Sequence, residues 1–263
     1  MITVGVAAGD GRSGVGARAL ADRLKLPLLP TAVVAETLQQ PAAVLFISSA
    51  GLYLQQTGKG APGPVAVDFG NAGMRHRRRA GQNEMLGRAV GVAKKPSLQV
   101  VDATAGLGRD SFVLADLGCR VCLCERNPLI TELLMDGLAQ ARVSGDTWLM
   151  QVCERMELYP GDARELGAKL MPSTDVIYLD PMFPARSKSA SVKKEMALFQ
   201  SLLDSGDMTA DGEALLDWSL SQEVARVVVK RPAKAPVLAG RRPSHEISGK
   251  AVRYDVYVLG ALV

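Results

Sequence analysis

Apolar and polar positions follow two different patterns along this chain. Over residues 1–74, short apolar runs are separated by glycine and proline, which is typical of brief strands joined by turns. The candidate strands are ITVGVA, AVLFISS, LYLQQ and PVAVDF, and one helix is predicted at residues 17–24. These features predict a small strand-rich α+β region at the N-terminus.

Beyond residue 97, apolar strand-like runs alternate with helical stretches. The candidate strands lie at residues 98–103, 120–125, 156–161, 175–180, 224–231 and 254–260. Helices are expected near residues 109–117, 128–142, 163–170, 192–204 and 212–222. This alternation predicts an α/β domain over residues 97–263, with a mostly parallel sheet covered by helices. A basic helical connection over residues 75–96, with a helix expected near residues 74–91, joins the two regions.

Composition and charge add a class of partner to this outline. The chain has 263 residues, of which 48% are hydrophobic, so it can bury a full core. Its formal net charge is only +4, but basic residues cluster, most densely in RHRRR at residues 75–79. Such a concentrated positive field favours contact with a polyanion, although solvated surface charge is the alternative for any single cluster.

Neither a membrane or secretory segment nor a metal site is indicated. The N-terminal residues lack a basic stretch followed by an apolar core, and no apolar run approaches about 18 residues. We therefore expect a cytoplasmic protein. The segment CRVCLC at residues 119–124 invites a metal interpretation, but Cys119 and Cys122 would point to opposite faces of a strand. No second cysteine pair completes a tetrahedral site, so buried thiols are expected instead.

The loops that follow the predicted strands carry the candidate chemistry. In an open α/β sheet, ligands bind where loops leave the carboxyl ends of the strands. The first such loop is VVDATAGLGRDS, with Asp102 near the strand end and Gly106 and Gly108 allowing a sharp turn close to a ligand. Because Ser111 stands at the third glycine of the dinucleotide fingerprint G-x-G-x-x-G, a nicotinamide cofactor is disfavoured.

The next two loops offer acceptors for a nucleoside. Glu125 lies 17 residues after Gly108, where a carboxylate commonly accepts hydrogen bonds from both hydroxyls of a ribose. A surface-facing glutamate is the alternative. In YPGDA, Asp162 could accept a hydrogen bond from an adenine amino group, and Ala163 leaves room for the ring. Asp162 is nearly as consistent with an ordinary polar turn.

The fourth loop, DPMFP, suggests chemistry on an amine. Enzymes that methylate exocyclic amines of nucleobases carry a related tetrapeptide, with Asn or Asp, two prolines and an aromatic residue at a strand end. Here Asp180, Pro181 and Phe183 match that pattern, and Met182 stands in place of the second proline. The Asp180 side chain and the Pro181 carbonyl could hold the two amine hydrogens, while Phe183 stacks on the base.

Together these segments resemble known methyltransferases. Residues 97–263 resemble the class I S-adenosylmethionine-dependent enzymes. The strings VDATAGLGRD, CERNP, YLDPMFP, VKKEM and VVVKRP, with VDFGNAGMRHRRR upstream, resemble the bacterial ribosomal RNA small subunit methyltransferase J family. This resemblance implies a Rossmann-like fold, with a seven-stranded mostly parallel sheet and helices on both faces. It also implies methylation of N2 of one guanosine near the 3′ end of 16S ribosomal RNA, with S-adenosylmethionine as donor and S-adenosylhomocysteine as product.

The same resemblance assigns residues to the cofactor. Besides Asp102, Gly106 and Gly108 of the glycine loop, the implied contacts are Arg109, Asp110, Glu125, Arg126, Asp162, Ala163 and Asp180. The Asp162–Ala163 pair departs from the serines more often seen there. Candidate contacts to RNA phosphates are Arg75, Arg77, Arg78, Arg79, Lys193, Lys194, Lys230 and Arg231.

Three other functions stay open from the residues alone. One is an amino methyltransferase acting on another RNA or on a DNA base, because the tetrapeptide does not name the base. Another is a nucleotide-dependent oxidoreductase on the same scaffold, which Ser111 and DPMFP argue against. The third is a non-catalytic RNA-binding module. The expected partner is 16S ribosomal RNA or the small ribosomal subunit, with no membrane, obligatory protein partner or metal.

Overall fold

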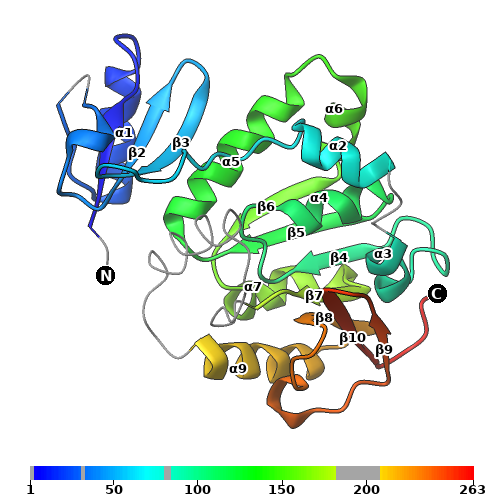
Figure 1. The fold of residues 1–263 in the computed structure, drawn as a ribbon. Coiled ribbons are helices and arrows are strands. Elements are labelled where there is room, and N and C mark those ends of the chain that lie inside the picture. Colours follow the sequence, from blue (N-terminus) through cyan, green and yellow to red (C-terminus); the bar gives the residue numbers. More distant parts are fainter. Residues whose placement is uncertain (1–2, 31–32, 80–83, 182–207) are drawn as a thin grey trace. The chain divides into compact units, whose positions relative to one another are not determined.

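The computed structural model describes residues 3–30, 33–79, 84–181 and 208–263 (Figure 1). These residues belong to two compact units. The small unit contains Met1–Asp68 and Asn127–Gln140, and the large unit contains Phe69–Arg126, Ala141–Pro184 and Asp207–Val263. The expected helix at residues 192–204 lies outside the described residues.

The small unit is built on a three-stranded sheet in the order β1-β2-β3. Strand β1 (Val4–Ala8) pairs in parallel with β2 (Ala43–Ser48), which pairs antiparallel with β3 (Gly51–Gln56). Helix α1 spans Gly14–Leu24 and a 3-10 turn, η1, spans Ala35–Thr37. Most of α5 (Pro128–Arg142) belongs to this unit, and Glu132 on it forms an ion pair with Arg23 of α1.

One predicted strand of the small unit is wrong. In the segment PVAVDF, only Val65 pairs with another strand, through an isolated bridge to Leu54. Pro62 and Pro64 precede that bridge and lack the N–H groups that a longer ladder would need. The segment is therefore an extended connection with a single point of pairing.

The large unit contains a seven-stranded sheet in the order β6-β5-β4-β7-β8-β10-β9. Neighbours among the first five strands pair in parallel, whereas β10 pairs antiparallel with both β8 and β9. This confirms the predicted α/β class with a mostly parallel sheet. The strands are β4 (Gln99–Asp102), β5 (Arg120–Glu125), β6 (Met156–Pro160), β7 (Val176–Leu179), β8 (Arg226–Pro232), β9 (His245–Ser248) and β10 (Val252–Val258).

Helices of the large unit cover both faces of its sheet. Because successive strand residues point to opposite faces, Ile177 and Leu179 pack with Leu216 of α9 on one side. Tyr178 points to the other side, where its hydroxyl reaches Asp110 of α4. The helices are α2 (Ala72–Arg79), α3 (Glu84–Val90), α4 (Arg109–Asp116), α6 (Thr147–Cys153), α7 (Ala163–Leu170) and α9 (Met208–Leu220), with 3-10 turns η2 (Met171–Ser173) and η3 (Leu238–Gly240).

Candidate active site at the carboxyl ends of the strands

The glycine loop leaves β4 and is anchored to the neighbouring strand β5. The backbone N–H of Ala105 donates to the Cys124 carbonyl, and that of Gly106 donates to Glu125 Oε2 at 2.9 Å. Gly106 and Gly108 have φ values of 53° and 71°, in the left-handed region that glycine adopts without strain. Glu125 is 8% exposed at the end of β5, so its carboxylate lies directly beside the turn. The structure therefore brings the glycine loop together with Glu125, the predicted ribose acceptor.

Asp102 at the end of β4 is a buried acceptor beneath this loop. Ser111 Oγ donates to its Oδ2, and the Thr104 N–H donates to its Oδ1 at 3.1 Å. Burial raises the pKa of Asp102 to about 7, although these hydrogen bonds oppose the rise. Ser111, which breaks the dinucleotide fingerprint, therefore holds the residue that ends β4. Local residue spacing does not reveal this role of Ser111.

A cluster of charges gathers where β4, β7 and β8 end. Lys230 Nζ lies 2.7 Å from Asp110 Oδ2 and 2.8 Å from Asp180 Oδ2. The Tyr178 hydroxyl also donates to Asp110 Oδ2, and the Asp180 N–H donates to Thr104 Oγ1. Asp180 and Asp110, expected from the sequence as separate contacts, are thus bridged by one ammonium group.

The protonation of this cluster depends on its mixed charges. Burial lowers the pKa of Lys230, but the carboxylates of Asp110 and Asp180 outweigh this effect and raise the pKa well above its usual value. Burial raises the pKa of Asp180, and the Lys230 ammonium opposes that rise. Lys230 therefore carries its charge throughout the physiological pH range.

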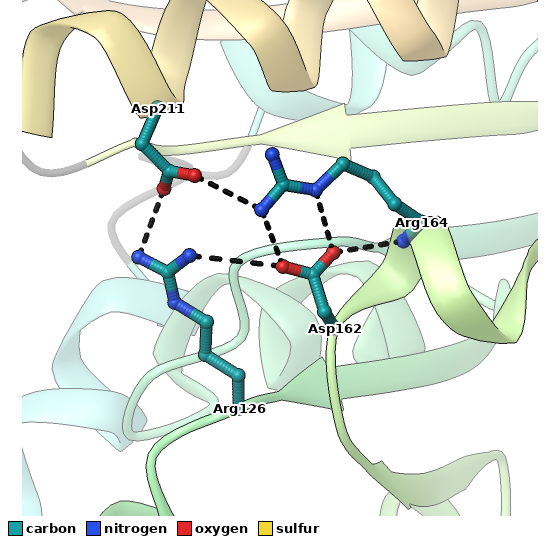
Figure 2. A network of polar contacts seen from close by, with 4 residues as sticks. All are labelled: Arg126, Asp162, Arg164 and Asp211. Atoms are coloured by element: carbon teal, nitrogen blue, oxygen red, sulfur yellow. Dashed lines mark hydrogen bonds and ion pairs between the residues drawn. The ribbon is translucent and has the colours of Figure 1, made fainter.

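A second ionic network lies beside the ends of β5 and β6 (Figure 2). Asp162 caps α7 by accepting from the Arg164 N–H, and its carboxylate also contacts the side chains of Arg164 and Arg126. Asp211 of α9 pairs with the same two arginines, at 2.8 Å to Arg126 and 2.9 Å to Arg164. Hydrogen bonds from Arg164 are the main reason that the pKa of Asp162 lies below its usual value. Arg164 and Asp211 could not be identified as site residues from the sequence, because α7 and α9 come together only in the folded chain.

Sequence comparisons identify the family of this chain. A family model described as SAM-dependent methyltransferase matches residues 29–259. Ribosomal RNA small subunit methyltransferase J of Cellvibrio japonicus is 47% identical over 248 residues, covering 92% of each chain. The protein of the same name from Thioalkalivibrio sulfidiphilus is 50% identical, covering 93% of each chain. This chain belongs to the ribosomal RNA small subunit methyltransferase J family.

A solved structure agrees with this assignment. A SAM-dependent methyltransferase from Neisseria gonorrhoeae is 32% identical and has a TM-score of 0.71. The match covers 97% of this chain and 96% of the chain in that structure. Membership of the J family makes the protein an S-adenosylmethionine-dependent methyltransferase. The donor set fits that cofactor, because Glu125 beside the glycine loop can accept hydrogen bonds from ribose hydroxyls.

The structure describes only some of the other residues that were predicted for the site. Arg109 is exposed at the first position of α4, Ala163 is buried after Asp162, and Pro181 is buried after Asp180. Met182, Phe183, Lys193 and Lys194 lie outside the described residues. Arg231 is 4% exposed and donates to the Pro236 carbonyl, a position that does not favour the phosphate contact expected of it.

The basic helix α2 uses part of its charge within the fold. The guanidinium groups of Arg75 and Arg78 lie 5.1 and 4.9 Å from the centroid of the Trp148 ring. Arg75 also pairs with Asp146 at 2.6 Å, and Arg78 with Asp116 at 3.2 Å. These two arginines therefore stabilise the packing of α2. The side chains of Arg77 and Arg79 lie outside the described part of the chain, and both residues remain predicted phosphate contacts.

The four cysteines are free thiols, and among the residues that the structure describes no group of three or more His, Cys, Asp or Glu side chains is arranged to hold a metal ion. Within the same residues, none of the helices has the length and apolar character needed to cross a bilayer.

Proposed function

We propose that this protein transfers a methyl group from S-adenosylmethionine to the exocyclic N2 of a specific guanosine near the 3′ end of 16S ribosomal RNA. The observation that carries the proposal is the position of Asp180, at the carboxyl end of β7 and beside the glycine loop that follows β4. The curated relatives are named for methylation of small-subunit ribosomal RNA, which supports that substrate class. A ribosomal substrate also supports action in the cytoplasm.

The cofactor is held in this proposal by the loops that follow β4, β5, β6 and β7. Glu125 binds both ribose hydroxyls, and Asp162 and Ala163 receive the adenine. Asp102, Gly106 and Gly108 shape the turn beside the methionine part, and Arg109, Asp110, Arg126 and Asp180 complete the contacts. When bound, the cofactor would supply a methyl group carried on a sulfonium, and the thioether that remains would be the leaving group. The protein then has to supply orientation and electrostatic stabilisation.

Asp180 and Pro181 act on the target amine. The lone pair of a guanine exocyclic nitrogen is conjugated into the ring, so the amine is a poor nucleophile. Hydrogen bonds from its two hydrogens to the Asp180 carboxylate and the Pro181 carbonyl favour a more tetrahedral nitrogen and stabilise its developing positive charge. Transfer would form the N–C bond and break the C–S bond of the bound cofactor, with the electron pair left on sulfur. The amine then loses one proton to the Asp180 carboxylate, directly or through a water molecule, and Phe183 is the predicted stacking partner of the base.

The proposed cofactor site leads to a prediction for Asp211. Replacing Asp211 with asparagine removes the charge that pairs with Arg126 and Arg164, without changing the size of the side chain. Because partly exposed ion pairs contribute at most about 1 kcal/mol each, we expect a rise of about two- to fivefold in the Kd for S-adenosylmethionine. Calorimetric titration with S-adenosylmethionine measures this Kd. Asp217→Asn, in the same helix and paired with Arg241, is the matched control, and equal Kd values for both variants would contradict this assignment.

The basic helix α2 leads to a prediction about the salt dependence of RNA binding. Replacing both Arg77 and Arg79 with alanine should weaken RNA binding and flatten the dependence of log Kd on log salt by about 0.7–0.9 per lost phosphate contact. Arg75→Ala should instead lower the melting temperature, because Arg75 pairs with Asp146 and packs on Trp148. Filter binding at several salt concentrations gives the slopes. A double variant with the wild-type slope would exclude these two arginines from the RNA contact.

Transfer of labelled methyl groups tests the proposed reaction. The purified protein, labelled S-adenosylmethionine and 16S RNA from cells lacking the enzyme should give labelled RNA, and small-subunit particles from the same cells show whether the assembled subunit is preferred. Label appearing in DNA adenine or cytosine instead of ribosomal RNA would exclude the proposal and favour the broader class of amino methyltransferases.

A further inference from the structure

Lys230 lies where the register of the sheet sets it beside Asp180. Strands β7 and β8 are parallel, and Leu179 pairs with Val229. The residues after this pair are Asp180, directly past the end of β7, and Lys230 within β8. The Lys230 side chain is 23% exposed, and its ammonium contacts one oxygen each of Asp110 and Asp180. A lysine held by two carboxylates at this depth is not placed like a surface contact to a phosphate.

The charges around Asp180 explain why a cation is needed there. Asp110 on α4 adds negative charge that opposes ionisation of Asp180, and the charges of Asp110 and Asp180 in turn oppose ionisation of Asp102. The Tyr178 hydroxyl satisfies Asp110 without changing the charge. Like charges in a partly desolvated site repel, and the ammonium of Lys230 offsets this repulsion and favours the ionised form of Asp180.

We propose that Lys230 is a positioning residue for methyl transfer, which binds Asp180 Oδ2 and so directs Oδ1 towards the target amine. This inference rests on the proposed role of Asp180. The N–H of Asp180 is fixed by Thr104 Oγ1 at the same time, so backbone and carboxylate are held from two sides. The amine therefore meets an acceptor that is already oriented and charged.

The two other uses of a lysine in this place give different kinetics. A lysine that binds an RNA phosphate would change the KM for RNA and the salt dependence of binding. A lysine that binds the carboxylate of the cofactor would change the Kd for S-adenosylmethionine. A positioning role predicts that kcat falls while both affinities stay close to the wild-type values.

The test uses three variants of Lys230 and one control. Lys230→Met removes the charge at similar length, Lys230→Gln keeps a polar group, and Lys230→Arg keeps the charge. Lys234→Met removes an equal charge from an exposed position four residues later. Each is assayed for kcat, the KM for RNA and the Kd for S-adenosylmethionine over a range of pH.

For Lys230→Met we expect kcat to fall by about 10- to 100-fold, with both affinities within about threefold. Because Lys230 lowers the pKa of Asp180, its loss raises that pKa, and the acid limb of the kcat profile moves to higher pH. Lys230→Gln should show the same shift, Lys230→Arg should recover much of kcat with the wild-type limb, and Lys234→Met should be unchanged. A loss confined to either affinity, or an unmoved acid limb, would overturn the proposal.

A measurement independent of activity separates this inference from the proposed function. Carbon-detected NMR titration of the aspartate carboxyl groups, in wild type and in Lys230→Met, should show the Asp180 signal titrating at higher pH in the variant. If wild type transfers no methyl group but the Asp180 titration moves, the proposed function fails while the ion triad stands. If wild type is active and neither titration nor kcat changes in the variant, the role of Lys230 fails alone.

Discussion

Replacing Asp180 with asparagine should lower kcat for RNA methylation by about 10³-fold, a loss typical of removing one preorganised electrostatic contact. The amide keeps the size of the side chain and can still accept a hydrogen bond from Lys230 through its oxygen. It lacks the negative charge that stabilises a developing positive charge on the amine, so the loss should fall mainly on the chemical step.

The control for Asp180→Asn is Asp217→Asn, which removes an exposed carboxylate from α9 and should leave kcat unchanged. Pre-steady-state transfer of labelled methyl groups measures the chemical step directly. Calorimetry shows whether cofactor binding persists, and the rise in Kd should be far smaller than the fall in rate. An Asp180→Asn enzyme that methylates RNA at the wild-type rate would remove Asp180 from the mechanism.

Replacing Glu125 with alanine should raise the Kd for S-adenosylmethionine by about 10²-fold or more. Hydrogen bonds to a charged acceptor contribute about 1.5–3 kcal/mol each, and the ribose offers two hydroxyls. The change also removes the acceptor for the Gly106 N–H, so the glycine loop loses its anchor on β5. Both effects act on binding of the cofactor rather than on the transfer step.

Calorimetric titration with S-adenosylmethionine measures this loss, and thermal unfolding shows whether the fold is retained. Glu157→Ala is the control, because Glu157 is an exposed glutamate on the neighbouring strand β6. If Glu125→Ala bound the cofactor as tightly as Glu157→Ala, the ribose would have to be held by another residue.

Much of the sheet could be predicted because its strands are apolar and bounded by turns. β7 is buried along its whole length, VIYL, and stands out as a continuous apolar run. β9, HEIS, is mostly exposed at the sheet edge, so it has no apolar run to detect. The proline-rich approach to Val65 shows the opposite error, since apolar residues there suggested a strand that lacks the donors to pair.

The site residues at the strand ends could be predicted from the sequence, whereas the contacts between different elements could not. Asp102, Glu125 and Asp180 each follow an apolar run, so the topology of parallel sheets brings them to one edge. The role of Lys230 depends on the register between β7 and β8, and that of Asp211 on where α9 begins, neither of which local spacing reveals. Arg75 and Arg78 form part of a basic cluster, but their packing on Trp148 arises only in three dimensions.

Nucleoside analysis of the RNA product decides whether this protein methylates N2 of a guanosine in 16S ribosomal RNA. The 16S ribosomal RNA of cells that lack this protein is digested and examined by mass spectrometry, before and after incubation with the purified enzyme and S-adenosylmethionine. We predict one additional N2-methylguanosine per RNA molecule, located near the 3′ end by mapping of RNA fragments. Methylation at another atom or on another base, or an unchanged nucleoside content with active, cofactor-binding protein, would contradict the claim.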